Sequence, residues 1–222
     1  MTKRRLLIFA SGSAEGGGSG FENLHVSTKK GMLDAEIIGV VSNREHGGVR
    51  ERADRLGVPF YHFGPPWSYA GYEVLKRELK PDFCAASGWL KPIRALDPRT
   101  TCNIHPGLLP KFGGSGMYGH HVHEAVMAAY GRGEITHTAV CMHFVTEEYD
   151  KGPCFFKMRV KINENDTPES LGARVNEGEH FWQPRITNMV VQGAIQWDGV
   201  DPKSLVVPPL YQIENHELDG IV

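Results

Sequence analysis

The chain lacks the long apolar run that a membrane span requires. No stretch of its 222 residues approaches the roughly 20 apolar residues that cross a bilayer as a helix. Residues 1–10 combine basic residues with an apolar run, as signal peptides do, but the run is too short and continues into glycine-rich sequence. We therefore expect a buried strand at this position.

The chain also lacks a large excess of positive or negative charge, and it lacks the closely spaced cysteines of a disulfide framework. Lys and Arg number 24 against 26 Asp and Glu, a net charge of −2 that argues against nucleic-acid binding as the main function. The cysteines are Cys84, Cys102, Cys141 and Cys154, each in or beside an apolar stretch. Such scattered thiols fit reduced core residues better than a disulfide framework or a zinc ribbon. We expect a cytoplasmic enzyme, monomeric or homodimeric, without nucleic-acid or membrane partners.

Apolar runs alternate with helical patterns through the first hundred residues. The runs predict strands over 6–10, 36–42, 60–63, 83–87 and 101–105, with helices over 21–30, 49–56 and 69–79. Continuous apolar runs are typical of strands buried on both faces. Right-handed crossovers between them predict an α/β fold with a Rossmann-like, doubly wound, mainly parallel sheet.

The pattern changes after Pro110. A helix is expected over 120–130, followed by strands over 138–145 and 154–162, whose short link favours an antiparallel pair. Thr167 is suited to cap a long C-terminal helix, with Pro168 at its first position. The segment from Trp197 onward is expected to wrap the surface.

Residues 103–110, Asn-Ile-His-Pro-Gly-Leu-Leu-Pro, are the most informative stretch. Asn103 and His105 are two apart, so on an extended strand their side chains point to the same side. One is an amide donor and the other titrates near neutral pH, and Pro106 then ends the strand. Taken alone, this spacing fits a catalytic pair and a merely polar strand end equally well.

Two loops carry further candidate chemistry. The glycine-rich segment 11–20 lies between a strand and a helix, where backbone N–H groups can converge on an anion. It is not a Walker A loop, and Glu15 would repel a pyrophosphate, but phosphate binding is favoured over a flexible connector. Asp150 lies in the later loop 146–153 and by itself is more typical of a turn. His105, His120, His121 and His123 lack partners at zinc-ligand spacing, so no metal is expected.

Together these segments resemble the folate-dependent formyltransferases, in family order over most of the chain. The resemblance is strongest to the members that formylate glycinamide ribonucleotide in purine biosynthesis. The Asn-x-His-Pro octet is highly specific to this superfamily. The matching pieces are Glu22-Asn23-Leu24, Val41-Ser42-Asn43-Arg44, Pro81-Asp82, Ser87-Gly88-Trp89-Leu90, residues 103–111, His143-Phe144-Val145, Asp150-Lys151-Gly152-Pro153, Asp166-Thr167, Arg174-Val175 and Glu179-His180.

The resemblance implies a catalytic set of Asn103, His105 and Asp150. A primary amine would attack the formyl carbon of the co-substrate 10-formyltetrahydrofolate, and no metal would be required. Asn103 would donate to the formyl oxygen, His105 would bind the developing charge or relay a proton, and Asp150 would hold protonated His105.

The same resemblance implies binding residues and a division of the chain. Substrate phosphate would lie on Gly18, Ser19, Gly20 and Asn23, and Glu179 would contact the ribose. Folate would bind along Trp89, Leu90, Lys91, Ile93 and Val145. One domain is expected over 1–222, with a nucleotide- or phosphate-binding half (1–105), a folate-binding and catalytic half (106–200) and a C-terminal tail (201–222).

Some features depart from the family pattern, and alternatives stay open. Loop 11–20 is long, segment 112–121 is expanded, and Lys91-Pro92-Ile93 replaces the commoner Arg-Ile-Leu. Another amine acceptor is possible, such as a nucleotide-linked amino sugar. An enzyme that formylates methionyl-tRNA would need a basic C-terminal domain. A formyltetrahydrofolate hydrolase would need an N-terminal regulatory domain. A non-catalytic or redox nucleotide-binding module would need an acidic residue at the end of the second strand, which instead ends Val41-Ser42-Asn43-Arg44.

Overall fold

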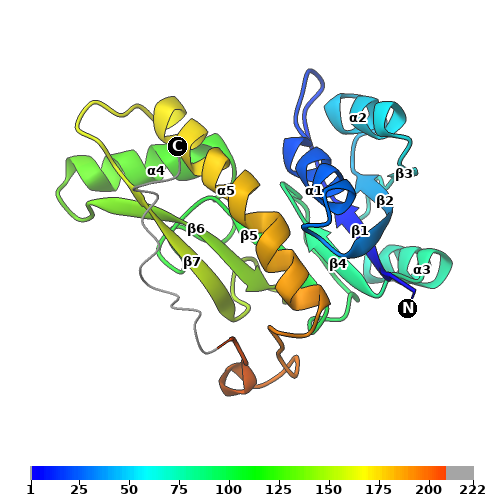
Figure 1. The fold of residues 1–222 in the computed structure, drawn as a ribbon. Helices are drawn as coiled ribbons and strands as arrows, with labels where there is room; N and C mark the ends of the chain where they lie inside the picture. The colour runs from blue at the N-terminus through cyan, green and yellow to red at the C-terminus, as the bar shows by residue number, and fades with distance from the viewer. Residues whose placement is uncertain (1, 209–222) are drawn as a thin grey trace.

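A computed structural model describes residues 2–208 and shows one seven-stranded sheet with helices packed against it (Figure 1). The spatial order of the strands is β3-β2-β1-β4-β5-β6-β7. The strands are β1 (Arg4–Phe9), β2 (Ala35–Ser42), β3 (Phe60–His62), β4 (Phe83–Ala86), β5 (Thr101–His105), β6 (His137–Phe144) and β7 (Cys154–Lys161). The helices are α1 (Ser19–Lys29), α2 (Gly48–Leu56), α3 (Tyr69–Leu79), α4 (His120–Gly131), α5 (Pro168–Val191) and the 3-10 turn η1 (Pro202–Ser204).

The predicted fold class is confirmed. Strands β3, β2, β1, β4 and β5 are mutually parallel, whereas β6 is antiparallel to both β5 and β7. A single sheet therefore runs through both halves expected from the sequence. The expected wrapping of the tail is described only to residue 208, where Gln196 pairs with Val206 and Trp197 packs on Phe144. Among the described helices, none is long and apolar enough to cross a membrane.

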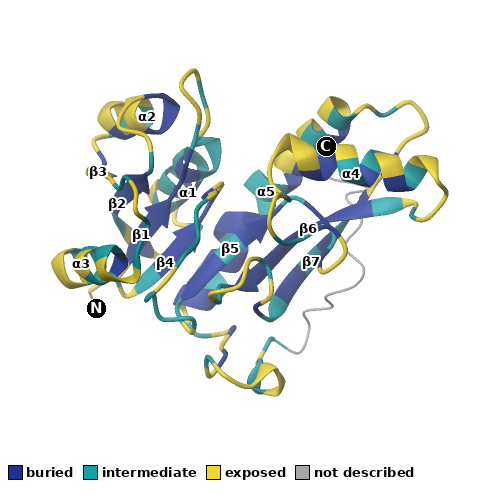
Figure 2. Ribbon diagram, turned by 180° about the vertical axis from the view of Figure 1, so that it is seen from behind, coloured by how far each residue is buried: buried dark blue, intermediate teal, exposed yellow. Residues whose placement is uncertain are grey.

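Alternation along the strands builds two different faces. Leu6 and Ile8 point into the main core, which α1, α2, α4 and α5 cover. Leu7 and Phe9 point to the opposite face, where α3 contributes the fully buried Tyr72. Figure 2 shows the resulting burial of the sheet between exposed outer helix surfaces. Over β5–β7, the α3 face is instead covered by loop residues such as Leu109.

The parallel strands end together at a crevice. From β1 the chain winds outward through β2 and β3, then returns to the other side of β1 and continues through β4 to β5. Ligands of open α/β sheets bind outside the carboxyl ends of the strands where the order reverses. In this chain that point lies between β1 and β4, so the loop after each of these strands opens onto it.

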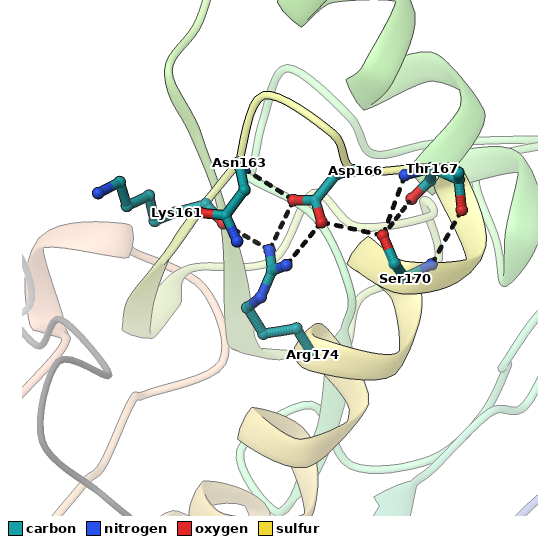
Figure 3. A network of polar contacts seen from close by, with 6 residues as sticks. All are labelled: Lys161, Asn163, Asp166, Thr167, Ser170 and Arg174. Atoms are coloured by element: carbon teal, nitrogen blue, oxygen red, sulfur yellow. Dashed lines mark hydrogen bonds and ion pairs between the residues drawn. The ribbon is translucent and has the colours of Figure 1, made fainter.

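The start of α5 is fixed by a polar network (Figure 3). The Thr167 side chain accepts from the Ser170 backbone N–H, and Ser170 Oγ accepts in return from the Thr167 N–H, which confirms the predicted N-cap. Asp166 accepts two hydrogen bonds from Arg174, about two turns into the helix, at 2.6 and 2.7 Å. Arg174 also donates to the Lys161 carbonyl, so the helix start is tied to the end of β7.

Replacing Asp166 with Asn should lower the free energy of unfolding by about 1–2 kcal/mol at neutral pH. The hydrogen bonds from Arg174 lower the pKa of Asp166 to about 2, from its usual value of 3.8. Stability gained from a depressed carboxyl pKa is present above the unfolded pKa and is lost as the pH falls through the folded one. Urea denaturation at a series of pH values should therefore show the two proteins converging below about pH 4.

The control is Asp54→Asn, which removes an exposed carboxylate from an i,i+4 pair with Arg50 and should change stability by less than about 0.5 kcal/mol. A stability difference for Asp166→Asn that persists undiminished to about pH 2 would contradict the assignment of this ion pair.

Candidate active site

A cavity of about 500 Å³ lies at the crevice. Its walls come from the loop before α1, the ends of β4 and β5, the loop 114–119, Asp150 and one side of α5. Residues predicted for catalysis and for phosphate and ribose binding line this one cavity: Gly18, Ser19, Gly20, Asn103, His105, Asp150 and Glu179. The geometry therefore brings together segments that are far apart in the sequence.

Strand β5 aims Asn103 and His105 to the same side, and Pro106 follows at the strand end. His105 is 3% exposed. Its Nε2 lies 2.7 Å from the Phe112 carbonyl, which only accepts, so Nε2 carries the proton and Nδ1 is left as a base in the neutral ring. Nδ1 lies 3.8 Å from Asp150 Oδ2, close enough for an ion pair but too long for a hydrogen bond.

Asp150 is held by its own loop and by the glycine-rich segment. The backbone of Asp150 is in the left-handed region, with φ of 56°. Its Oδ2 accepts from the Gly114 N–H at 2.9 Å, and a side chain at Gly113 would approach the Asp150 Cβ to 3.0 Å. Part of the expanded segment 112–121 thus positions the predicted catalytic carboxylate.

His143 is a site residue that the sequence reasoning missed. It lies directly opposite Asn103 in the β5–β6 pairing and is 2% exposed. Its Nδ1 lies 2.8 Å from the Phe144 carbonyl, so in the neutral ring Nε2 accepts the hydrogen bond from Asn103 Nδ2 at 3.1 Å. The same Nε2 lies 3.3 Å from Asp150 Oδ1. The sequence signal for His143 is indirect: side chains alternate between the two faces of a strand, and the antiparallel pairing puts His143 on the face that carries Asn103.

The pKa shifts favour an anionic carboxylate beside a neutral imidazole. Burial lowers the pKa of His105, and the charge of Asp150 only partly opposes this. Burial acts to raise the pKa of Asp150, but the His143 hydrogen bond, the charge of His105 and the Gly114 N–H together lower it below the usual value. Near neutral pH the site therefore holds one negative charge and a base.

The start of α1 lines one end of the cavity and has the geometry of an anion site. Gly18 caps the helix in the left-handed conformation, with φ of 79°, and the first-turn N–H groups have no intrahelical partners. Ser19 Oγ lies 3.2 Å from His180 Nε2 on α5. Among the described residues that line the cavity, none is Lys or Arg, so backbone N–H groups and the helix dipole provide the positive potential.

Two predicted features of the phosphate site lie elsewhere. Asn23 does not line the cavity, because its Nδ2 donates to the His180 carbonyl at 2.6 Å and so ties α1 to α5. Glu15 is exposed in the loop before α1 and also lies outside the cavity lining. Glu15 therefore does not face the cavity in which we expected it to repel a pyrophosphate.

Glu179 projects from α5 into the cavity, where it is half-buried and accepts from Asn176 Nδ2 at 3.2 Å. Burial raises the pKa of this carboxyl to about 7, and the single hydrogen bond only partly opposes the shift. A carboxyl group that is part protonated near neutral pH can donate as well as accept hydrogen bonds.

A smaller cavity of about 50 Å³ adjoins the first, and Trp89, Asn103, Tyr149 and Asp150 border both. Of the predicted folate residues, Trp89, Lys91, Ile93 and Val145 line the smaller cavity and Leu90 lines the larger one. The Trp89 side chain is 7% exposed and its indole N–H donates to Tyr72 Oη at 3.0 Å, so Trp89 serves mainly as a core wall. Within residues 2–208, no group of three or more His, Cys, Asp and Glu is arranged to hold a metal ion.

Comparison with known proteins agrees with this geometry. The family model described as formyl transferase matches residues 4–187. The chain is 33% identical over 211 residues to "Phosphoribosylglycinamide formyltransferase, chloroplastic" of Arabidopsis thaliana, covering 89% of this chain and 70% of the relative. It is 26% identical to the Bacillus subtilis protein of that name, over 85% of this chain and 95% of the relative. A glycinamide ribonucleotide transformylase structure from Symbiobacterium toebii has a TM-score of 0.75 at 26% identity, covering 89% of this chain and 92% of its own.

Replacing Glu179 with Gln should stabilise the protein selectively at higher pH. A carboxyl whose folded pKa is raised loses stability as the pH rises from its unfolded value, near 4.5, through the folded value of about 7. The thermal or urea stability of the variant relative to the unmodified protein should therefore increase over this window by on the order of 1–3 kcal/mol and then level off.

Glu177→Gln is the matched control, because Glu177 lies exposed on the same helix. A pH-independent difference between Glu179→Gln and the unmodified protein would refute the raised pKa.

Proposed function

The chain belongs to the formyl transferase family, and from this premise we propose that it transfers the formyl group of 10-formyltetrahydrofolate to the amine of glycinamide ribonucleotide. One observation carries the proposal: Asn103, His105 and Asp150 line one cavity together with the N-terminus of α1, and Asn103 and Asp150 also border a smaller neighbouring cavity. The nucleotide would occupy the larger cavity. The pterin is too large for the 50 Å³ cavity alone and would lie where Ile93 and Val145 also line a cavity of about 350 Å³.

The proposed chemistry begins with attack of the neutral primary amine on the formyl carbon. The developing oxyanion requires a donor, and Asn103 can supply one because its Nδ2 carries two hydrogens, of which one is used by His143. Donors of this kind act where the charge appears in the transition state, and losing one typically costs about 3–4 kcal/mol of barrier.

The amine must then lose a proton before the carbon–nitrogen bond to folate breaks. Asp150 is the anionic group beside the reaction centre, and His105 Nδ1 faces it as a base. We assign proton acceptance to this pair, with Asp150 stabilising His105 once the ring is protonated. His143 acts on the reaction through Asn103 and Asp150, which it contacts, and is a positioning residue.

Contacts to the phosphate and to the ribose would orient glycinamide ribonucleotide in the cavity. Its phosphate would lie on the N–H groups around Gly18, Ser19 and Gly20, and its ribose hydroxyls would reach Glu179. The pterin would lie against Ile93, Val145 and the backbone of Leu90 and Lys91. Asn23 would support this site only indirectly, by fixing α1 against α5.

We also propose a cytoplasmic location and a monomeric or homodimeric state. The plant relative is named as chloroplastic, so cell fractionation with a tagged chain decides the first. Light scattering of the purified chain decides the second.

The decisive assay mixes the purified chain with glycinamide ribonucleotide and 10-formyltetrahydrofolate, and follows the formylated product by mass spectrometry. Parallel reactions contain a nucleotide-linked amino sugar, or no acceptor at all. Product only with glycinamide ribonucleotide is expected. Product only with the amino sugar would replace the proposed acceptor, and folate deformylation without any acceptor would point to a hydrolase.

In this assay, Asn103→Ala and Asp150→Asn should each lower kcat/KM by about 10²–10³-fold. Asn165→Ala and Asp54→Asn are matched controls at exposed positions and should retain full activity. If the site variants fold, as judged by circular dichroism, and match the unmodified chain, the catalytic assignment is wrong.

Gly20→Ala should weaken acceptor binding. A Cβ at Gly20 would lie 2.1 Å from Ser87 Oγ, so either Ser87 gives up its hydrogen bond to Gln183 or the start of α1 moves away from the end of β4. We expect the KM for glycinamide ribonucleotide to rise about tenfold or more with a smaller change in kcat, as for lost ground-state binding. Gly131→Ala, which places its Cβ in open space at the end of α4, should leave KM unchanged, and an equal effect of both variants would contradict the phosphate assignment.

A further inference from the structure

Two cysteines lie on the same face of the sheet as the catalytic strand residues. In the antiparallel pairings, Asn103 is opposite His143, which is opposite Cys154, and His105 is opposite Cys141. Residues directly opposite one another point to the same side of a sheet. Cys141 and Cys154 are thus diagonal neighbours on β6 and β7, one and two strands away from β5.

The two cysteines share one small apolar cluster. Leu108 and Cys154 pack against its buried members Cys141, Leu109 and Ala139, and the Cys154 thiol donates to the Phe156 carbonyl at 3.3 Å. The pairing of β6 with β7 is irregular between Met142 and His143, at the point where Cys154 begins β7. Diagonal residues are normally farther apart than a disulfide spans, so closing the bond requires backbone movement, and the irregular pairing is the place where the strands can move.

Their environments differ in a way that assigns a role to each. Cys141 is fully buried, whereas Cys154 is half-buried and therefore reachable by a small oxidant. The hydrogen bond from Cys141 and the positive charge of Lys157 lower the pKa of Cys154 to about 7, although burial opposes them. Cys154 is therefore the more nucleophilic of the two.

We propose that Cys141 and Cys154 form a redox modification site, in which a hydroperoxide converts the two thiols into a reversible intrachain disulfide. The Cys154 thiolate attacks one peroxide oxygen, the O–O bond breaks, and the leaving oxygen takes a proton to become water or an alcohol. The Cys141 sulfur then attacks the resulting sulfenic acid, the S–O bond breaks, and the Cys141 proton leaves with the hydroxide as water. The peroxide is reduced by two electrons, and a dithiol reductant reverses the change.

The bond would act on the site through its backbone. Closing the disulfide draws the Cβ atoms of Cys141 and Cys154 to about 3.8 Å. Cys154 is opposite His143 and follows Asp150 by four residues. The movement therefore displaces the contact of His143 with Asn103 and its contact with Asp150. We expect oxidation to lower formyl transfer at least tenfold; this consequence rests on the proposed function, whereas the disulfide itself does not.

The first arm of the test measures the bond alone. The intact chain is treated with hydrogen peroxide, free thiols are alkylated, and peptides are mapped by mass spectrometry. A crosslinked peptide pair containing Cys141 and Cys154, lighter by two hydrogen atoms, is expected, with Cys84 and Cys102 alkylated only after unfolding because both are buried. Cys154 converted to sulfinic acid without the crosslink, or no oxidation at all, would overturn the proposal.

The second arm measures transfer activity before and after peroxide, and again after dithiothreitol. The unmodified chain should lose activity and regain it, while Cys141→Ser and Cys154→Ser should keep theirs, and Cys84→Ser should behave as the unmodified chain. Loss of activity that persists in both site variants would refute the link to catalysis. If no activity exists before oxidation, the proposed function fails, and the first arm still decides the disulfide.

Discussion

The antiparallel pairing of β5 with β6 is the constraint on which the site depends. Parallel strands β1, β4 and β5 bring their carboxyl ends to one crevice, and a further parallel strand would have started at the far edge. Because β6 instead runs back along β5, its last residues lie beside Asn103, and the loop that leaves it returns Asp150 to the same place. One reversal of strand direction therefore assembles the polar cluster.

That cluster is stable because each buried polar group has a partner. An unpaired carboxylate in such a position would cost several kcal/mol. Asp150 avoids this cost by accepting from the Gly114 N–H, and His105 and His143 each use a backbone carbonyl for one ring nitrogen. In His105 the Phe112 carbonyl fixes the tautomer, so the nitrogen that faces the carboxylate is the one that can change its protonation.

Most strands and helices of this fold could be predicted from the sequence, because strands that are buried on both faces appear as continuous apolar runs. The seven described strands, helices α1 to α4 and the start of α5 lie within two residues of the predicted bounds, since apolar runs and the capping residue Thr167 are local signals. Asn103 and His105 are also local, as neighbours on one strand. Asp150 joined them only through the family motif, because nothing in its own loop shows that it returns to β5.

The features that sequence reasoning missed all depend on long-range register. His143 reaches the site because it is opposite Asn103 in the β5–β6 pairing. Asn23 donates to the carbonyl of His180, which lies 157 residues away in the sequence. The burial that shifts the pKa of Glu179 likewise comes from the walls of a cavity built by several elements. Such facts require the packed arrangement, which pattern and propensity do not supply.

The electrostatics of the large cavity follow from the same packing. The nearby arginines Arg52 and Arg55 are engaged with Glu22 outside the cavity lining, so they do not neutralise a ligand directly. A phosphate on the N–H groups of α1 would then share the cavity with two carboxyl groups. Asp150 must be anionic to accept a proton, and Glu179, with its pKa raised to about 7, can be neutral. The fold thus separates the two carboxyls by environment, keeping a negative charge at Asp150 in the proposed reaction centre and reducing it at Glu179 beside the proposed phosphate site.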